Sequence, residues 1–118
     1  MAALDRTVAE FRTDPDRGYL TGPSMGGNGT SRFIIPANSG EAFAALARRV
    51  GRLPTWIFHG EIDPVVAVSE SRRAAEALRA AGGNVRYTEF LGGGHNVWDG
   101  TYASPQFQEW LFAQRRAR

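Results

Sequence analysis

"LPTWIFHGEIDPVV", residues 53–66, is the stretch that decides the fold. Its apolar run "WIF" is bounded by Pro54 and Gly60, which predicts a β-strand covered on both faces. The carboxyl group of Asp63 falls in the loop directly after this strand. Because functional sites in an open α/β sheet lie at the carboxyl ends of the strands, this loop is the first candidate for a functional site.

The segments around this strand predict two helices and another strand. Residues 38–50, "NSGEAFAALARRV", place apolar side chains at helical spacing, with a short strand as the alternative for the end of this segment. Residues 69–83, "SESRRAAEALRAAGG", predict the strongest helix, which a glycine pair ends. Residues 84–90, "NVRYTEF", form a strand by β-propensity and length.

The two ends of the chain follow the same alternation. Residues 3–11 predict a short amphipathic helix, and residues 19–22, "YLTG", predict a short buried strand. A helix is expected after Ser24, and Pro36 must end or kink it. Residues 104–116, "SPQFQEWLFAQRR", close the chain as a capped helix.

This order of elements predicts the fold class. Strands that alternate with helices imply an α/β fold with a mainly parallel sheet of about three to four strands and flanking helices. With 118 residues, the chain is expected to form a single domain over residues 1–118.

Composition excludes several classes of protein. No apolar run is long enough to cross a bilayer, and the N-terminus lacks a secretory pattern, so we expect a cytoplasmic protein without a membrane partner. The absence of cysteine excludes disulfides, thiolate zinc sites and cysteine nucleophiles. All 14 basic residues are arginine and the net charge is +2, which favours solvated helix faces over a nucleic-acid surface.

Each predicted strand leads into a reactive side chain. Ser24 follows the first strand, Asp63 follows the second, and His95 follows the third after three consecutive glycines. The carboxyl ends of neighbouring parallel strands meet at one rim of the sheet. We therefore expect a hydroxyl, a carboxylate and an imidazole to come together, in the chain order Ser, Asp, His.

The turn "GPSMG", residues 22–26, resembles the nucleophile elbow of the α/β-hydrolase superfamily, and the chain order of the three side chains matches that superfamily too. The segments "DPDRGYLTGPSMGG", "LPTWIFHGEIDPVV" and "VRYTEFLGGGHNVWD" are similar to those of carboxylesterases of the phospholipase/carboxylesterase and polyhydroxybutyrate-depolymerase/feruloyl-esterase-like groups. The resemblance covers nearly the whole chain but only the C-terminal half of the usual fold.

The resemblance implies a serine esterase that hydrolyses short-chain carboxylic esters through an acyl-enzyme on Ser24. His95 would be the general base, Asp63 would orient its imidazole, and the backbone N–H of Met25 would face the oxyanion. Trp98 would line the substrate pocket, although a packing role is the simpler interpretation. Such an enzyme needs no cofactor and no metal.

Other readings of the same residues stay open. A metal site formed by His59, Glu61, Asp63 and His95 is conceivable but lacks a convincing ligand spacing, and His59 alone reads as a packed, hydrogen-bonded histidine. The chain is alternatively a truncated hydrolase domain, weak or inactive in catalysis, that serves as an interaction or assembly module. In a third interpretation, the same three side chains act on peptides or thioesters.

Two departures from the family pattern predict a need for partners. A loop before the elbow normally donates a second N–H to the oxyanion, and no segment of this sequence corresponds to it. Asn28, Asn96 or a partner subunit would have to substitute. The strand before the elbow would also lie near a sheet edge, so we expect a homo-oligomer that covers it.

Overall fold

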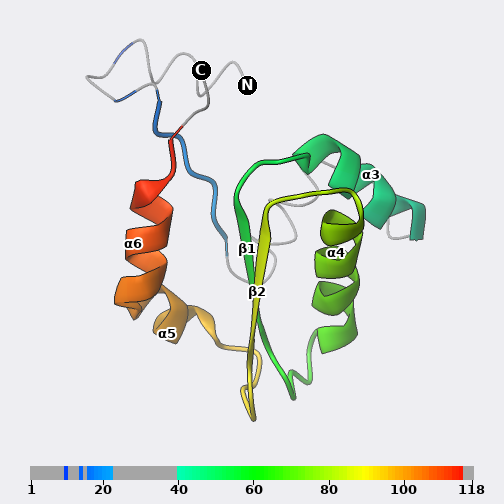
Figure 1. Cartoon of the computed structure of the whole chain (residues 1–118). Helices are drawn as coiled ribbons and strands as arrows, with labels where there is room; N and C mark the ends of the chain where they lie inside the picture. The colour runs from blue at the N-terminus through cyan, green and yellow to red at the C-terminus, as the bar shows by residue number, and fades with distance from the viewer. Residues whose placement is uncertain (1–9, 11–13, 15, 23–39, 116–118) are drawn as a thin grey trace.

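The computed structural model describes residues 10, 14, 16–22 and 40–115. The elements within residues 40–115 follow one another in the order helix, strand, helix, strand, helix, helix (Figure 1). They are α3 (Gly40–Val50), β1 (Thr55–Gly60), α4 (Val68–Ala80), β2 (Val85–Phe90), α5 (Trp98–Ala103) and α6 (Pro105–Ala113). In this part of the chain, no helix has the length and apolar content that crossing a bilayer requires.

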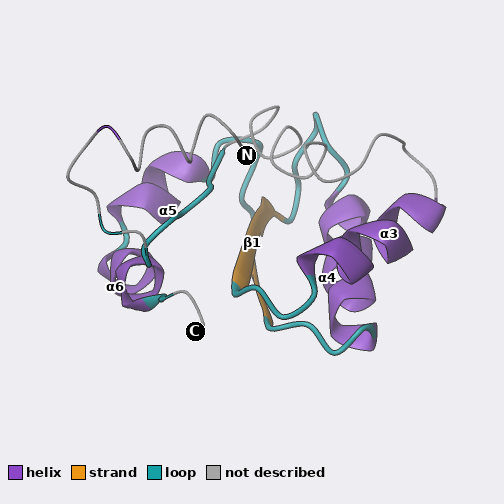
Figure 2. Ribbon diagram, turned by 90° about the horizontal axis from the view of Figure 1, so that it is seen from above, coloured by secondary structure: helices purple, strands orange, loops and turns teal. Residues whose placement is uncertain are grey.

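β1 and β2 form a two-stranded parallel sheet, joined through α4. The pairing runs in register from Thr55 opposite Val85 to Gly60 opposite Phe90, so both strands end at the same level. Figure 2 shows α3 and α4 on one side of the strands and α5 and α6 on the other. The α/β fold class expected from the sequence is confirmed.

The face of the sheet toward α3 and α4 carries an aliphatic core. Ile57 of β1 and Val85 of β2 pack against a buried cluster formed by Ala47, Val50 and Leu78. Leu78 is only 2% exposed, and burying a side chain of this size contributes roughly 1.5–3 kcal/mol. This cluster fixes both helices against the strands.

The opposite face of the sheet carries aromatic side chains, because neighbouring residues of a strand point to opposite faces. The Trp56 ring meets Trp110 of α6 edge-on, with ring centroids 5.3 Å apart. Phe58 meets Phe107 in the same way at 5.5 Å, and Phe107 is buried. The apolar run of β1 is therefore covered on both faces, as its sequence predicts.

The predicted stop of α4 at two glycines is confirmed in detail. Gly82 has a φ of +75°, and its N–H bonds to the Arg79 carbonyl, while the Gly83 N–H bonds to the Leu78 carbonyl at 2.8 Å. These two bonds form a Schellman motif, which satisfies the last carbonyls of the helix. The start of α6 is also as predicted, because the Ser104 hydroxyl accepts a hydrogen bond from the Phe107 N–H.

One predicted strand is wrong and one helix was not predicted. Residues 19–22 have no strand structure, and the sheet of the described residues has two strands, below the expected three to four. The Tyr19 hydroxyl donates instead to the Gln114 carbonyl after α6, and the Thr21 hydroxyl bonds to that of Tyr102 in α5. α5 itself is the helix that was not predicted. The helices expected at residues 3–11 and after Ser24 fall largely outside the described residues.

Candidate active site

Glycines bring the two loops at the carboxyl ends of the strands into direct contact. The Gly60 backbone lies against the carbonyl groups of Gly93 and Gly94, where a Cβ on Gly60 would have no room. The Ile62 N–H donates to the Gly93 carbonyl at 3.0 Å, and the Gly92 N–H donates to the Glu61 carboxylate at 2.9 Å. The loops that carry Asp63 and His95 are thus joined by contacts that involve neither of these two side chains.

Asp63 and His95 meet across this junction. The His95 Nδ1 lies 2.9 Å from the Asp63 Oδ2, within hydrogen-bond distance. The Asp63 side chain is 4% exposed, whereas that of His95 is 24% exposed, so the imidazole forms the solvent side of the pair. Because an ionised carboxylate only accepts hydrogen bonds, Nδ1 carries the proton and Nε2 is the basic nitrogen of the neutral ring.

The other oxygen of Asp63 is held by its own loop. Its Oδ1 accepts hydrogen bonds from the backbone N–H groups of Val65 and Val66 at 2.8 and 2.9 Å. Burial by itself would raise the pKa of Asp63, but the hydrogen bonds from Val66, His95 and Val65 outweigh it and lower the pKa to about 2. Asp63 is therefore a carboxylate at neutral pH.

His59 adjoins the same carboxylate from the end of β1. It is buried, with 8% of its surface exposed, and its Nε2 lies 3.2 Å from the Asp63 Oδ2. Its two nitrogens also contact the Val66 carbonyl at 2.9 Å and the Ser71 hydroxyl at 2.6 Å. The expectation of a packed, hydrogen-bonded histidine is confirmed.

Trp98 stands beside His95 at the start of α5. The two rings meet edge-on, with centroids 5.4 Å apart and planes at 86°. Asn96, one of the side chains considered as an oxyanion donor, instead donates from its amide to the Asp99 carboxylate at 3.0 Å. The Asn96 Oδ1 also accepts a hydrogen bond from the Asp99 backbone N–H at 3.4 Å, which ties Asn96 to the first turn of α5.

The remaining predicted site residues are not among those described. Ser24, Met25 and Asn28 lie outside the described residues, so their roles stay predictions. Within the described residues, no group of three or more carboxylate and imidazole side chains is arranged to hold a metal ion. Glu61, named in that alternative, bonds to the Gly92 N–H.

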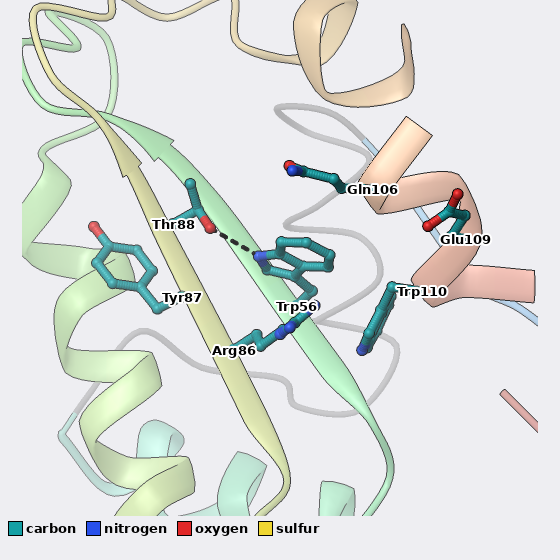
Figure 3. A pocket seen from close by; sticks show the side chains of 7 residues that line it. All are labelled: Trp56, Arg86, Tyr87, Thr88, Gln106, Glu109 and Trp110. Carbon is teal, nitrogen blue, oxygen red and sulfur yellow. Dashed lines mark hydrogen bonds between the residues drawn. The ribbon is translucent and has the colours of Figure 1, made fainter. Parts of the chain in front are cut away.

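A separate hollow lies between the sheet and α6 (Figure 3). Its volume is about 610 Å³, and the Trp56 indole on its wall donates to the Thr88 hydroxyl at 3.0 Å. The Arg86 guanidinium lies 4.5 Å from the centre of the Trp56 ring. Neither Asp63 nor His95 lines this hollow, so we place the candidate active site at the paired side chains and not at the hollow.

Comparison with solved structures relates this geometry to a known fold. The chain superposes on part of a protein described as a thermostable esterase, with a TM-score of 0.81 and 32% sequence identity. That esterase is an α/β-hydrolase, so the fold of this chain matches part of an α/β-hydrolase fold. The superposition covers 98% of this chain but 35% of that esterase, so the chain corresponds to about a third of its length. No family model and no curated protein sequence matches the chain.

The sequence predicted that Asp63 and His95 pair, but not the contacts that support them. The contacts of His59 with Ser71 and Val66 were not foreseen, because Ser71 lies on α4 and no local pattern links it to a strand end. The spacing from His59 to Asp63 was the available signal. The turn after β1, in which the Asp63 N–H donates to the Gly60 carbonyl at 3.3 Å, brings these two side chains together.

Proposed function

We propose that the chain is a serine esterase whose nucleophile is Ser24, with His95 as general base and Asp63 as the orienting acid. The observation that carries the proposal is the 2.9 Å contact between the His95 Nδ1 and the Asp63 Oδ2, at the rim where parallel strands end. The similarity to part of a thermostable esterase supports the same chemistry.

In the proposed reaction, the Ser24 hydroxyl attacks the ester carbonyl while the His95 Nε2 takes its proton. Asp63, held ionised by its loop, stabilises the imidazolium that forms. The Met25 N–H donates to the oxyanion, and the proton on Nε2 then passes to the leaving alcohol. Water hydrolyses the acyl-enzyme by the same route, with His95 again accepting the proton.

Short-chain, activated esters are the proposed substrates. The Trp98 ring lies nearly perpendicular to that of His95, with centroids 5.4 Å apart, and offers an apolar wall close to the base. A single wall of this kind suits a small acyl group better than a long lipid chain. The proposal therefore places Trp98 in the substrate-binding surface and leaves the catalytic proton transfer to His95.

A fluorophosphonate probe tests the proposal, because only a serine activated by a base reacts with it rapidly. We expect labelling of the wild type and loss of both labelling and ester hydrolysis in Ser24→Ala and His95→Ala. The matched control is Ser69→Ala, which removes an exposed hydroxyl at the start of α4. Full turnover by Ser24→Ala would refute the mechanism.

The second candidate function is an interaction or assembly module. The observation that favours it is that the chain corresponds to 35% of the length of the esterase it matches. An unlabelled wild type that is folded by circular dichroism would select this alternative over the esterase.

A further inference from the structure

Asp63 has more hydrogen-bond partners than the pairing with His95 requires. Its Oδ1 accepts two backbone N–H groups, and its Oδ2 faces the imidazoles of both His95 and His59. The distances from Oδ2 are 2.9 Å to the His95 Nδ1 and 3.2 Å to the His59 Nε2. The carboxylate is therefore contacted from three sides, and the His95 side chain is more exposed than that of His59.

The proton on His59 can be assigned from its neighbours. Its Nε2 lies 2.9 Å from the Val66 carbonyl and close to the Asp63 carboxylate, and both of these groups only accept hydrogen bonds. Nε2 must therefore carry a hydrogen. In the neutral ring the Nδ1 then accepts from the Ser71 hydroxyl at 2.6 Å. His59 is thus the Nε2–H tautomer, whereas His95 is the Nδ1–H tautomer.

These contacts tie the Asp63 loop to two elements of the fold. His59 is the second-last residue of β1, and Ser71 belongs to the first turn of α4. Val66 contributes both a carbonyl to His59 and an N–H to Asp63. The His59 imidazole therefore links the end of β1 to the following loop and to α4. A loop held in this way keeps the carboxylate from rotating away from its partner.

We propose that His59 is a positioning residue, which holds the Asp63 carboxylate in the orientation that receives the His95 Nδ1–H. This inference rests on the proposed function, because His95 matters as a base only in that reaction. His59 does not act on the substrate itself: it acts through Asp63. Ser71 is the second member of this arrangement, since its hydroxyl fixes the tautomer of His59.

Two substitutions at position 59 separate positioning from mere packing. His59→Leu keeps an apolar side chain in the buried site but removes both nitrogens. His59→Gln keeps an N–H donor near the place of Nε2. We expect His59→Leu to lower kcat for p-nitrophenyl acetate by about 10- to 100-fold with KM unchanged, because small misplacements of a catalytic group cost this much. We expect His59→Gln to recover most of the loss.

Nitrogen NMR gives a readout that does not depend on activity. The chain has two histidines, so in the position-59 variants His95 is the sole imidazole. We expect His95 to be the Nδ1–H tautomer in the wild type and in His59→Gln. In His59→Leu we expect a mixture with the Nε2–H form, which an imidazole in water prefers.

The outcomes distinguish the inference from the function on which it rests. A folded His59→Leu variant with wild-type kcat and an unmixed Nδ1–H tautomer would overturn the positioning role and leave the esterase proposal intact. A wild type without esterase activity, but with the expected change of tautomer, would overturn the esterase proposal alone. If His59→Leu does not fold, Ser71→Ala decides by the same two measurements, with Ser69→Ala on the same helix as control.

Discussion

Gly60 and Gly94 are packed backbone against backbone at the point where β1 ends, with the carbonyl of Gly94 in the space that a Cβ on Gly60 would fill. This contact explains why a glycine ends the strand. A side chain at Gly60 would force apart the two loops that carry Asp63 and His95. The geometry of the candidate active site therefore depends on backbone packing as well as on its polar side chains.

The substitution Gly60→Ala is expected to damage both stability and activity. The added methyl group would meet rigid backbone atoms, and overpacking of this kind costs about 1–3 kcal/mol in the free energy of unfolding. Urea unfolding measures the loss, and ester hydrolysis measures the effect on the site.

Gly100→Ala is the matched control for that substitution. Gly100 is exposed in α5, and a Cβ there would meet no atom within 4 Å. Alanine is favoured over glycine within a helix by roughly 1 kcal/mol, so this variant is expected to be as stable as the wild type or more so. Equal losses in both variants would contradict the role given to Gly60.

Asp63→Asn is expected to reduce kcat by a factor of roughly 10⁴, as the loss of the orienting carboxylate does in other serine hydrolases. The amide that replaces Oδ2 would favour the wrong tautomer of His95, and it would not stabilise the imidazolium. Stopped-flow or steady-state kinetics on a short ester measure the change. A kcat within a few-fold of the wild type would show that Asp63 does not act on His95.

Stability is expected to fall in acid through Asp63. Its folded pKa is about 2, below the value of ~3.9 for an aspartate in an unfolded chain, so the unfolded state binds more protons between these values. The contribution is therefore complete above pH ~4 and is lost as pH falls toward ~2. Urea unfolding measured at several pH values in this range should show that the free energy of unfolding depends less on pH in Asp63→Asn than in the wild type.

Glu89 must be considered in the same titration. Hydrogen bonds from Arg72 and Tyr87 lower its pKa to about 2, so it contributes in the same direction and in the same pH range. Glu89→Gln is therefore expected to reduce the pH dependence of the free energy of unfolding on its own. The double variant, Asp63→Asn with Glu89→Gln, is expected to reduce it further. A pH dependence that survives in the double variant would have to come from other groups.

Self-association is expected from the edges of the sheet. Within the described residues, β1 and β2 each have a strand partner on one side only, which leaves backbone groups available for another chain. We expect size-exclusion chromatography with light scattering to find a dimer or larger assembly at micromolar concentration. A monomer across that whole range would rule this out.

The elements with strong local signals could be predicted from the sequence. The apolar run before Gly60, the glycine pair after α4 and the Ser104 cap each act within a few residues, so pattern and structure agree there. The pairing of Asp63 with His95 was also predictable, because it follows from parallel strands that end together.

Features that depend on distant contacts could not be predicted. Tyr19 and Thr21 have β-propensity, yet their hydroxyls bond to α6 and α5, and propensity does not foresee such partners. α5 is short and contains Gly100, so its sequence lacks a helical pattern, and the bond between Asn96 and Asp99 supports its first turn. The contact between His59 and Ser71 is likewise visible only once β1 and α4 are in place.

The shared register of the two strands has a consequence for changes in loop length. Gly60 and Phe90 are paired, so the two strands end at the same level. The number of residues from each strand end to Asp63 or His95 therefore decides whether the two side chains meet. Deleting or inserting one residue between Phe90 and His95 would move the imidazole off its carboxylate without touching either side chain. The connection from α4 to β2 does not set this distance, although the turn at Gly82 and Gly83 and the bond from the Thr55 N–H to the Asn84 carbonyl fix its own length.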